Sequence, residues 1–259
     1  MDPIQKLKRV INNRVCCVIS KGKSVEELER NIELFRNKKV CWIVQNRFDY
    51  IEDILKKIGE KADIISDCAT VSRKELFEKE VRYDRFFNFL MRSDLNLLAT
   101  SELVLEENKE YAGKKDFDLR TTFKNKIVTI DSVFSSPNCP KEVWDKPPNS
   151  LTLLLAFLIA GQAKNIILFG IDGARPGQAI LDSYYKPDIA RAERRLTFGD
   201  ERTGSVVSDG KDFNERWAKI EAIYKIAFNN PDVKIYNGSS ISLIKTFPKI
   251  NYKKIKELL

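Results

Sequence analysis

The chain has 259 residues, a length that fits one large α/β domain or one domain with a small appendage. Hydrophobic residues make up 43% and charged residues 32%, so a sizeable core can be buried under a solvated surface, and neither value indicates disorder. Histidine is absent. Serine–histidine hydrolysis and histidine-based zinc catalysis are therefore excluded, because both need an imidazole.

The formal net charge is +8, but the lysines are dispersed among many acids. This pattern favours a solvated surface; no nucleic-acid partner is expected, and peripheral contact with a membrane surface is compatible with the charge. No apolar stretch reaches 18 residues and the N-terminus lacks a signal-peptide pattern, so we expect a cytoplasmic protein. The cysteines lack metal-ligand spacing, and the adjacent Cys16 and Cys17 should point to opposite faces of a strand as reduced thiols.

The first third of the chain alternates helical and strand-like patterns. Asp2-Pro3 opens a helix, and the continuous apolar run Val15–Ile19 predicts a strand buried on both faces. Ser24–Arg36 is predicted as a helix in which Ser24 and Glu27 form a capping box. Strands at Val40–Val44 and Ala62–Ser66 follow, with a helix from about Asp49 to Ile58 between them. Such alternation predicts βαβ units and a parallel sheet.

The remaining elements continue this pattern less regularly. We expect a helix at Phe86–Met91, strands at Leu95–Ala99 and Ile127–Ile130, and a proline-rich loop over Asp131–Pro148. The C-terminal part predicts a helix Ser150–Ala163, a strand Asn165–Gly170, a polar lid over about 173–210, a helix Asp212–Ala227, a strand Val233–Tyr236 and a helix Tyr252–Leu259. We therefore expect one Rossmann-like α/β domain over residues 1–259, with a mostly parallel sheet and helices on both faces.

The turn Ser20-Lys21-Gly22-Lys23-Ser24 lies at the carboxyl end of the first predicted strand, where open α/β sheets bind ligands. Gly22 allows a close backbone approach, and the amides that begin the next helix, together with two lysines, favour a phosphate. The spacing matches neither a P-loop nor the Gly-x-Gly-x-x-Gly fingerprint, so NAD is not expected. An ordinary strand–helix turn with a capped helix explains the same residues equally well.

Polar side chains also follow other predicted strands. Asn46 has a carboxamide suited to a base or ribose, and Arg47 a guanidinium suited to a phosphate. Asp67 and Asp172 each follow a strand, and either carboxylate is suited to hold Mg²⁺ or to orient a substrate hydroxyl. Asp also occurs in turns for purely conformational reasons.

The predicted lid is rich in tyrosine and arginine. Its arginines are suited to clamp a diphosphate or an acidic sugar, although a helix with a basic exposed face is the alternative. The residues considered are Tyr184, Tyr185, Arg191, Arg194, Arg195, Arg202, Ser208 and Asp209.

The segment Ser150–Asp172, SLTLLLAFLIAGQAKNIILFGID, resembles part of the Campylobacter-type bacterial sialyltransferases, in which a serine opens an apolar helix and the next strand ends in Gly-Ile-Asp. The layout also occurs in a wider superfamily that includes motility accessory factors and archaeal 6-hydroxymethylpterin diphosphokinases. Gly22–Val25 falls where family members carry Gly-Pro-Ser-Leu, Asn46 looks like an Asn after the second strand, and Asp67 looks like a polar residue after the third. The C-terminal residues Val233–Asn237, Ser242 and Phe247-Pro248 are also similar.

The resemblance implies a nucleotide or nucleotide-sugar site and a tyrosine-containing lid. The implied site residues are Gly22, Ser24, Asn46, Asn149 and Ser150, and the lid residues are Tyr184 and Tyr185. Two departures stand out: Lys23 takes the place of the family's proline, and the catalytic histidine expected near Ser208-Asp209 is missing. Asp209 is the residue that would replace it as a base.

Three functional hypotheses remain open. In the first, a glycosyltransferase-like enzyme uses a nucleotide-activated sugar, CMP-linked, and transfers it to a small-molecule, glycan or protein acceptor. Its phosphate would lie on the Gly22–Ser24 turn and Asn46 would contact the ribose or base. Asp209 or Asp172 would deprotonate the acceptor, and Tyr184, Tyr185 and an arginine would stabilise the departing phosphate.

The second hypothesis is a Mg²⁺-dependent diphosphokinase that transfers diphosphate from ATP to a hydroxymethylpterin-like alcohol. Asp67 or Asp172 would hold the metal. The third is a nucleotide-binding protein without catalysis, which the missing histidine favours. All three are compatible with a homo-oligomer.

Overall fold

The computed structural model describes residues 1–20, 22–45, 51–68, 89–112, 118–135, 150–172, 217, 221–242 and 244–259. Its centre is a seven-stranded sheet with the order β5-β4-β3-β2-β1-β6-β7, in which every neighbouring pair is parallel. The strands are β1 Val15–Ile19, β2 Val40–Gln45, β3 Ile64–Asp67, β4 Leu97–Thr100, β5 Ile127–Thr129, β6 Asn165–Phe169 and β7 Lys234–Asn237. The predicted α/β fold with a parallel sheet is confirmed.

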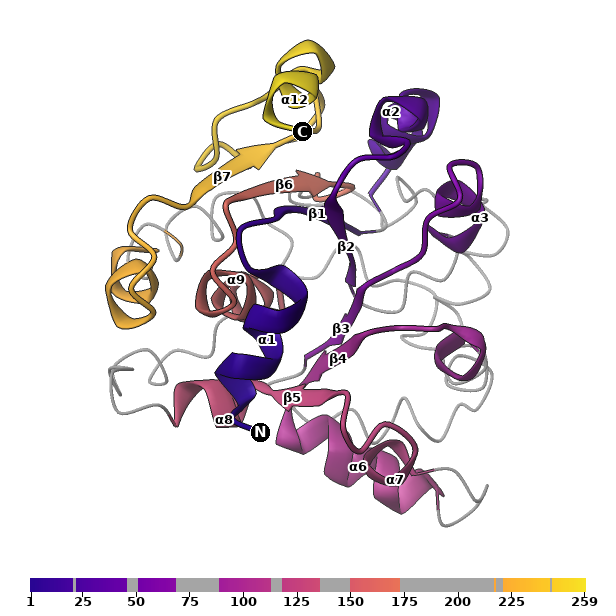
Figure 1. Cartoon of the computed structure of the whole chain (residues 1–259), viewed down its shortest axis with the longest axis vertical. Helices are drawn as coiled ribbons and strands as arrows, with labels where there is room; N and C mark the ends of the chain where they lie inside the picture. Colours follow the sequence, from indigo (N-terminus) through magenta and orange to yellow (C-terminus); the bar gives the residue numbers. More distant parts are fainter. Residues whose placement is uncertain are drawn as a thin grey trace, which may run out of the picture.

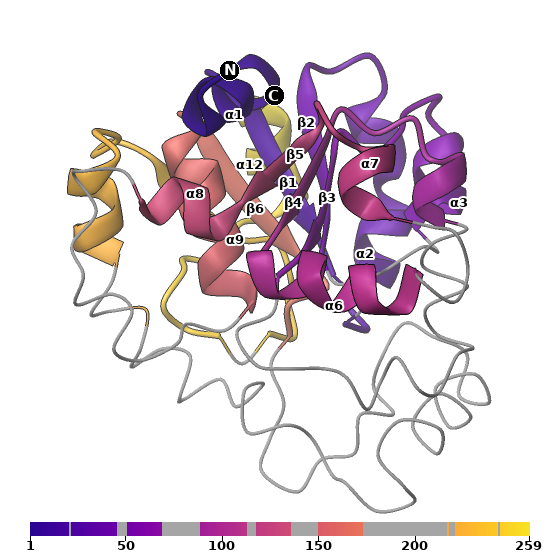
Figure 2. The same cartoon turned by 90° about the horizontal axis from the view of Figure 1, so that it is seen from below.

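Helices cover both faces of this sheet (Figures 1 and 2). One face carries α1 Pro3–Ile11, α8 Ile130–Phe134, α9 Ser150–Ala160 and the helical residues 221–227. The other carries α2 Val25–Arg30, η1 Ile32–Phe35, α3 Ile51–Lys56, α6 Glu102–Ala112, α7 Leu119–Thr122 and α12 Tyr252–Leu258. Cys16 belongs to the first core and Cys17 to the second, as expected for adjacent residues of a strand. Both thiols are buried and free.

The most deeply buried helix among the described residues is α9, which packs beside α1 and α8 on one face of the sheet (Figure 1). Every residue from Leu151 to Ala160 is buried, which explains why this helix is apolar on all sides. Helix α1 starts as predicted, because the carboxylate of Asp2 accepts a hydrogen bond of 3.0 Å from the amide of Gln5. No helix among the described residues is long and apolar enough to cross a membrane.

Two predicted elements differ from the structure. The predicted helix over residues 24–36 is divided, because α2 ends at Arg30 and a 3₁₀ turn, η1, follows Asn31. The capping box is wrong: Ser24 already has helical backbone angles and its side chain makes no capping bond. The predicted loop from Asp131 is also wrong at its start. There α8 forms, because the hydroxyl of Thr129 accepts a hydrogen bond of 3.3 Å from the amide of Ser132.

The strand order creates a reversal point between β1 and β6. The chain leaves β1 toward α2 on one face of the sheet, whereas it enters β6 from α9 on the opposite face. Trp217, which follows β6, also packs on the α9 face. In open α/β sheets, ligands usually bind at the carboxyl ends of two strands whose connections diverge in this way.

Candidate functional site at the carboxyl ends of the strands

The turns after β1 and β6 are in direct backbone contact at this reversal point. The amide of Gly22 donates to the carbonyl of Gly170 at 2.8 Å, and the amide of Ser20 donates to the carbonyl of Phe169 at 2.9 Å. A Cβ atom on Gly22 would lie 2.5 Å from the Gly170 oxygen. Gly170 has a φ of +67°, and a Cβ there would lie 2.3 Å from the Ser20 oxygen. The close approach of these turns therefore depends on glycine at both positions.

The carboxylate of Asp172 joins the two turns. Its Oδ2 accepts a hydrogen bond of 2.9 Å from the amide of Ser24, and its Oδ1 accepts from the Ser24 hydroxyl. The same Oδ1 accepts a bond of 2.8 Å from the hydroxyl of Ser239. The Ser24 hydroxyl in turn accepts from the amide of Gly170 at 3.1 Å, and Ser24 is only 2% exposed. Two residues predicted from distant segments, the buried Ser24 and the partly buried Asp172, thus form one polar junction.

A third loop, which follows β7, completes this junction. The amide of Ser239 donates to Oδ1 of Asn237 at 3.0 Å, which fixes the loop to the end of the strand. The amide of Ser240 donates to Glu27 at 3.2 Å, and its hydroxyl bonds to the same carboxylate. Ser239 was not among the predicted site residues. Its only signal is a polar turn directly after a strand, and that signal does not reveal its partner.

Most backbone amides at the start of α2 already have acceptors inside the protein. Those of Val25 and Glu26 donate to the carbonyls of Gly22 and Lys23, each at 3.1 Å, and that of Ser24 donates to Asp172. The amide of Lys23 has no hydrogen-bond partner among the described residues, and its side chain is exposed. Any anion that binds to the described part of this turn would therefore meet Lys23 rather than the amide of Ser24.

A second polar group lies where β2 ends and α9 begins. Nε2 of Gln45 lies 3.4 Å from the hydroxyl of Ser150, the first residue of α9, and Gln45 is only 4% exposed. Ser150 was predicted as a site residue, whereas Gln45 was missed because it looks like the last residue of an apolar strand. This contact places the N-terminus of an 11-residue helix at the carboxyl edge of the sheet.

The two aspartates considered as metal ligands belong to different places. Asp67 ends β3, is 2% exposed, and its carbonyl accepts from the hydroxyl of Thr100 at 2.8 Å. Because β2 and β1 lie between β3 and β6, the ends of these strands are separated by roughly 14 Å, from three strand spacings of about 4.8 Å. One Mg²⁺ ion therefore cannot be shared by Asp67 and Asp172. Within the described ranges, no three His, Cys, Asp or Glu side chains gather as a metal site.

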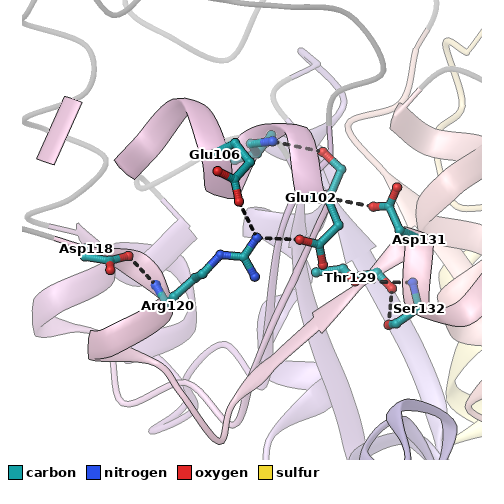
Figure 3. Close-up of polar contacts among 9 residues, drawn as sticks. Glu102, Glu106, Asp118, Arg120, Thr129, Asp131 and Ser132 are labelled. Atoms are coloured by element: carbon teal, nitrogen blue, oxygen red, sulfur yellow. Dashed lines mark hydrogen bonds and ion pairs between the residues drawn. The ribbon is translucent and has the colours of Figure 1, made fainter. Parts of the chain in front are cut away.

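The edge formed by β4 and β5 is occupied by contacts within the protein (Figure 3). Oδ2 of Asp131 accepts a hydrogen bond of 2.8 Å from the amide of Glu102, which is the first residue of α6. Arg120 pairs with the carboxylates of Glu102 and Glu106. These contacts hold the starts of α6 and α7 in place. The polar side chains at the ends of β4 and β5 are therefore assigned a structural role, and the candidate site is the carboxyl edge of the strands from β3 to β7.

Several predicted site residues are not part of this geometry. The residues Lys21, Asn46, Arg47, Asn149, Tyr184, Tyr185 and Asp209, with the predicted lid 173–210, lie outside the described residues. Their roles stay predictions.

The sequence matches no protein-family model and no curated protein. Among solved structures, the chain is similar to the sialyltransferase CstII from Campylobacter jejuni in complex with a substrate analogue, cytidine-5′-monophosphate, with a TM-score of 0.50 and 17% identity. A variant of the sialyltransferase CST-II in complex with CMP gives a TM-score of 0.56 and 16% identity. Each match covers 92% of this chain and 86% of the other.

At this level of identity the likeness shows a shared fold, and it supports the sialyltransferase part of the resemblance at that level. The motility accessory factors and the diphosphokinases receive no support from it.

Proposed function

We propose that this protein is a glycosyltransferase-like enzyme that uses a CMP-linked sugar, bound at the carboxyl edge of the sheet around β1 and β6. The observation that carries the proposal is the junction of the turns after β1 and β6 at the reversal point of the sheet. Support comes from the fold shared with CMP-bound sialyltransferases.

Several described residues are suited to bind a nucleotide at this edge. Lys23 offers an exposed ammonium and a backbone amide without an acceptor among the described residues. Ser150 stands at the positive end of the α9 dipole, and Gln45 fixes its hydroxyl. The proposal extends to Asn46 and Asn149, the sequence neighbours of Gln45 and Ser150.

The chemistry proposed is transfer of the sugar to an acceptor hydroxyl. The acceptor oxygen forms a bond to the anomeric carbon, the bond from that carbon to the phosphate oxygen breaks, and CMP leaves with the electron pair. Asp209 takes the hydroxyl proton, and Tyr184 and Tyr185 donate hydrogen bonds to the leaving phosphate. Asp209 is assigned the base role because it stands where the resemblance expects the catalytic histidine, whereas the carboxylate of Asp172 accepts three hydrogen bonds within the protein.

Turnover of a CMP-linked acidic sugar tests this function. We expect acceptor-dependent release of CMP that resists EDTA, and a fall in kcat of at least about 100-fold in Asp209→Asn, since general-base catalysis contributes 10²–10⁴-fold. Turnover of ATP that EDTA abolishes would instead support the diphosphokinase. CMP binding without release from any donor would support a non-catalytic protein.

A further inference from the structure

The carboxylate of Asp172 binds the backbone amide and the hydroxyl of Ser24, the residue directly before α2. The amides of Val25 and Glu26 have carbonyl acceptors within the turn, whereas the amide of Ser24 has none there. Here the amide of Ser24 already donates to Oδ2 of Asp172, and the Ser24 hydroxyl donates to Oδ1. The protein therefore supplies its own anion at this turn.

We propose that Asp172 is a positioning residue, which acts through Ser24 to hold the turn after β1 in the shape that the nucleotide site needs. Ser239 supports it from the loop after β7. We call Asp172, Ser24 and Ser239 the Asp172 lock. The proposal rests on the proposed function only in that the ligand is taken to be a nucleotide.

The chain uses the same arrangement a second time, at the start of α6 (Figure 3). Asp131 follows β5, the neighbour of β4, and its Oδ2 accepts from the amide of Glu102 at 2.8 Å. Asp172 follows β6, the neighbour of β1, and accepts from the amide of Ser24 at 2.9 Å. In both places an aspartate after one strand binds the start of the helix that follows the adjacent strand. This repetition supports a role in fixing helix starts.

The surroundings of Asp172 also fit a positioning role better than proton transfer. A general base needs an oxygen within hydrogen-bond reach of the substrate proton. Oδ1 of Asp172 already accepts from two hydroxyls, and the Ser24 hydroxyl is fixed from its other side by the amide of Gly170. Gly22 also lies close to this carboxylate, because a Cβ atom there would lie 2.6 Å from Oδ2.

The negative charge of the Asp172 lock limits where the phosphate of a nucleotide can bind. A phosphate placed against the amide of Ser24 would lie beside the carboxylate of Asp172 and would be repelled by it. The charged part of the nucleotide should therefore lie away from this amide, on the side of Lys23 or Ser150. Asp172 then shapes the site without contacting the phosphate.

The test combines hydrogen exchange of the Ser24 amide with the CMP dissociation constant, measured on the full chain. The variants are Asp172→Ala, Asp172→Asn and Ser239→Ala, with Ser240→Ala as the matched control because its hydroxyl bonds to Glu27 instead. We expect Asp172→Ala and Ser239→Ala to speed exchange of this amide at least about tenfold and to raise the Kd for CMP about tenfold. Asp172→Asn should keep the exchange rate of the Ser24 amide and the Kd for CMP close to their wild-type values. Its amide oxygen can accept from the amide of Ser24, and the hydroxyls of Ser24 and Ser239 can rotate to accept from its NH₂ group.

The proposal is overturned if neither Asp172→Ala nor Ser239→Ala speeds exchange of the Ser24 amide. It is also overturned if Asp172→Asn lowers kcat 100-fold or more at an unchanged Kd, which would indicate proton transfer or metal binding by the carboxylate. Should Asp172→Ala fail to fold, Ser239→Ala decides the outcome. Failure of the wild-type protein to bind any nucleotide would refute the proposed function, while the exchange measurement would still decide whether the lock exists.

Discussion

The amide of Ser24 donates a 2.9 Å hydrogen bond to Oδ2 of Asp172 across 148 residues of sequence. This bond links the first turn of α2 to the end of β6, at the point where the connections of the sheet reverse. The turn after β1 and the Gly-Ile-Asp segment at the end of β6 are therefore parts of one structure.

Gly22→Ala should disrupt this structure. The added Cβ would lie 2.5 Å from the Gly170 oxygen and 2.6 Å from Oδ2 of Asp172, so the two turns must separate. We expect a loss of about 1–3 kcal/mol in unfolding free energy and weaker CMP binding. Urea denaturation and titration calorimetry measure the two effects. Gly59→Asn is the control, because nothing lies within 4 Å of a Cβ there and Asn tolerates its φ of +74°; equal losses in both variants would contradict the prediction.

Ser150→Ala should weaken nucleotide binding more than it weakens the fold. The change removes the hydroxyl that contacts Gln45 at the start of α9. We expect the Kd for CMP to rise about fivefold to tenfold, in line with the loss of about 1 kcal/mol for one hydrogen bond. Ser93→Ala, which removes the hydroxyl bonded to Glu52 ahead of β4, should leave the Kd unchanged. An unchanged Kd in Ser150→Ala would remove this residue from the site.

Asp63 should contribute to the free energy of unfolding without affecting the affinity for the nucleotide. It lies at the amino edge of the sheet, where its carboxylate accepts from the amide of Trp42 and from Asn96, each at 2.9 Å, and pairs with Arg14 at 3.2 Å. Asp63→Asn should cost about 2 kcal/mol, because an amide nitrogen would face one of these donors. Urea denaturation should show this loss, and calorimetry an unchanged Kd for CMP. A change in the Kd would show that the two edges of the sheet are coupled.

Two buried thiols should make the protein less stable at alkaline pH. Burial raises the pKa of Cys17 well above its usual value of 9.0, and a hydrogen bond with Cys16 together with burial raises the pKa of Cys41. In the unfolded chain both thiols ionise near pH 9, so the native state binds these protons more tightly. The stability that they contribute is complete below about pH 9 and is lost as the pH rises toward the native pKa values.

The slope approaches about 1.4 kcal/mol per pH unit for each thiol. Urea denaturation at pH 8, 9 and 10 measures this slope, and Cys17→Ala should make it shallower. The same slope in the wild type and in the variant would contradict the assignment to Cys17.

The strands were the most predictable part of the fold. Val15–Ile19 was predicted with the bounds that β1 has, because a parallel strand covered on both faces must be continuously apolar. The strand at Asn165–Gly170 was predicted for the same reason, and β6 ends one residue earlier, at Phe169. The order of the strands was not predictable, since no local pattern records that β6 returns to lie beside β1.

Residues of the candidate site could be predicted only where their neighbours in the sequence form a recognisable local motif. Ser24 and Glu27 have the spacing of a capping box, but in the structure their side chains bond to Asp172 and Ser240, which are distant in sequence. The hydrogen bonds to these distant residues take the place of the predicted capping box. Ser239 was missed for the complementary reason, because only the fold brings its hydroxyl to Asp172.

A thermal-shift measurement with CMP tests the central claim, that a nucleotide binds at this edge of the sheet. A ligand that binds only the native state adds about 2.7 kcal/mol at 100 times its Kd. For a chain of this length we therefore expect CMP to raise the melting temperature by about 5–10 °C, with or without Mg²⁺. CDP, UDP, GDP and ATP at the same concentration should raise it less. An unchanged melting temperature with all five nucleotides at millimolar concentration would contradict the account.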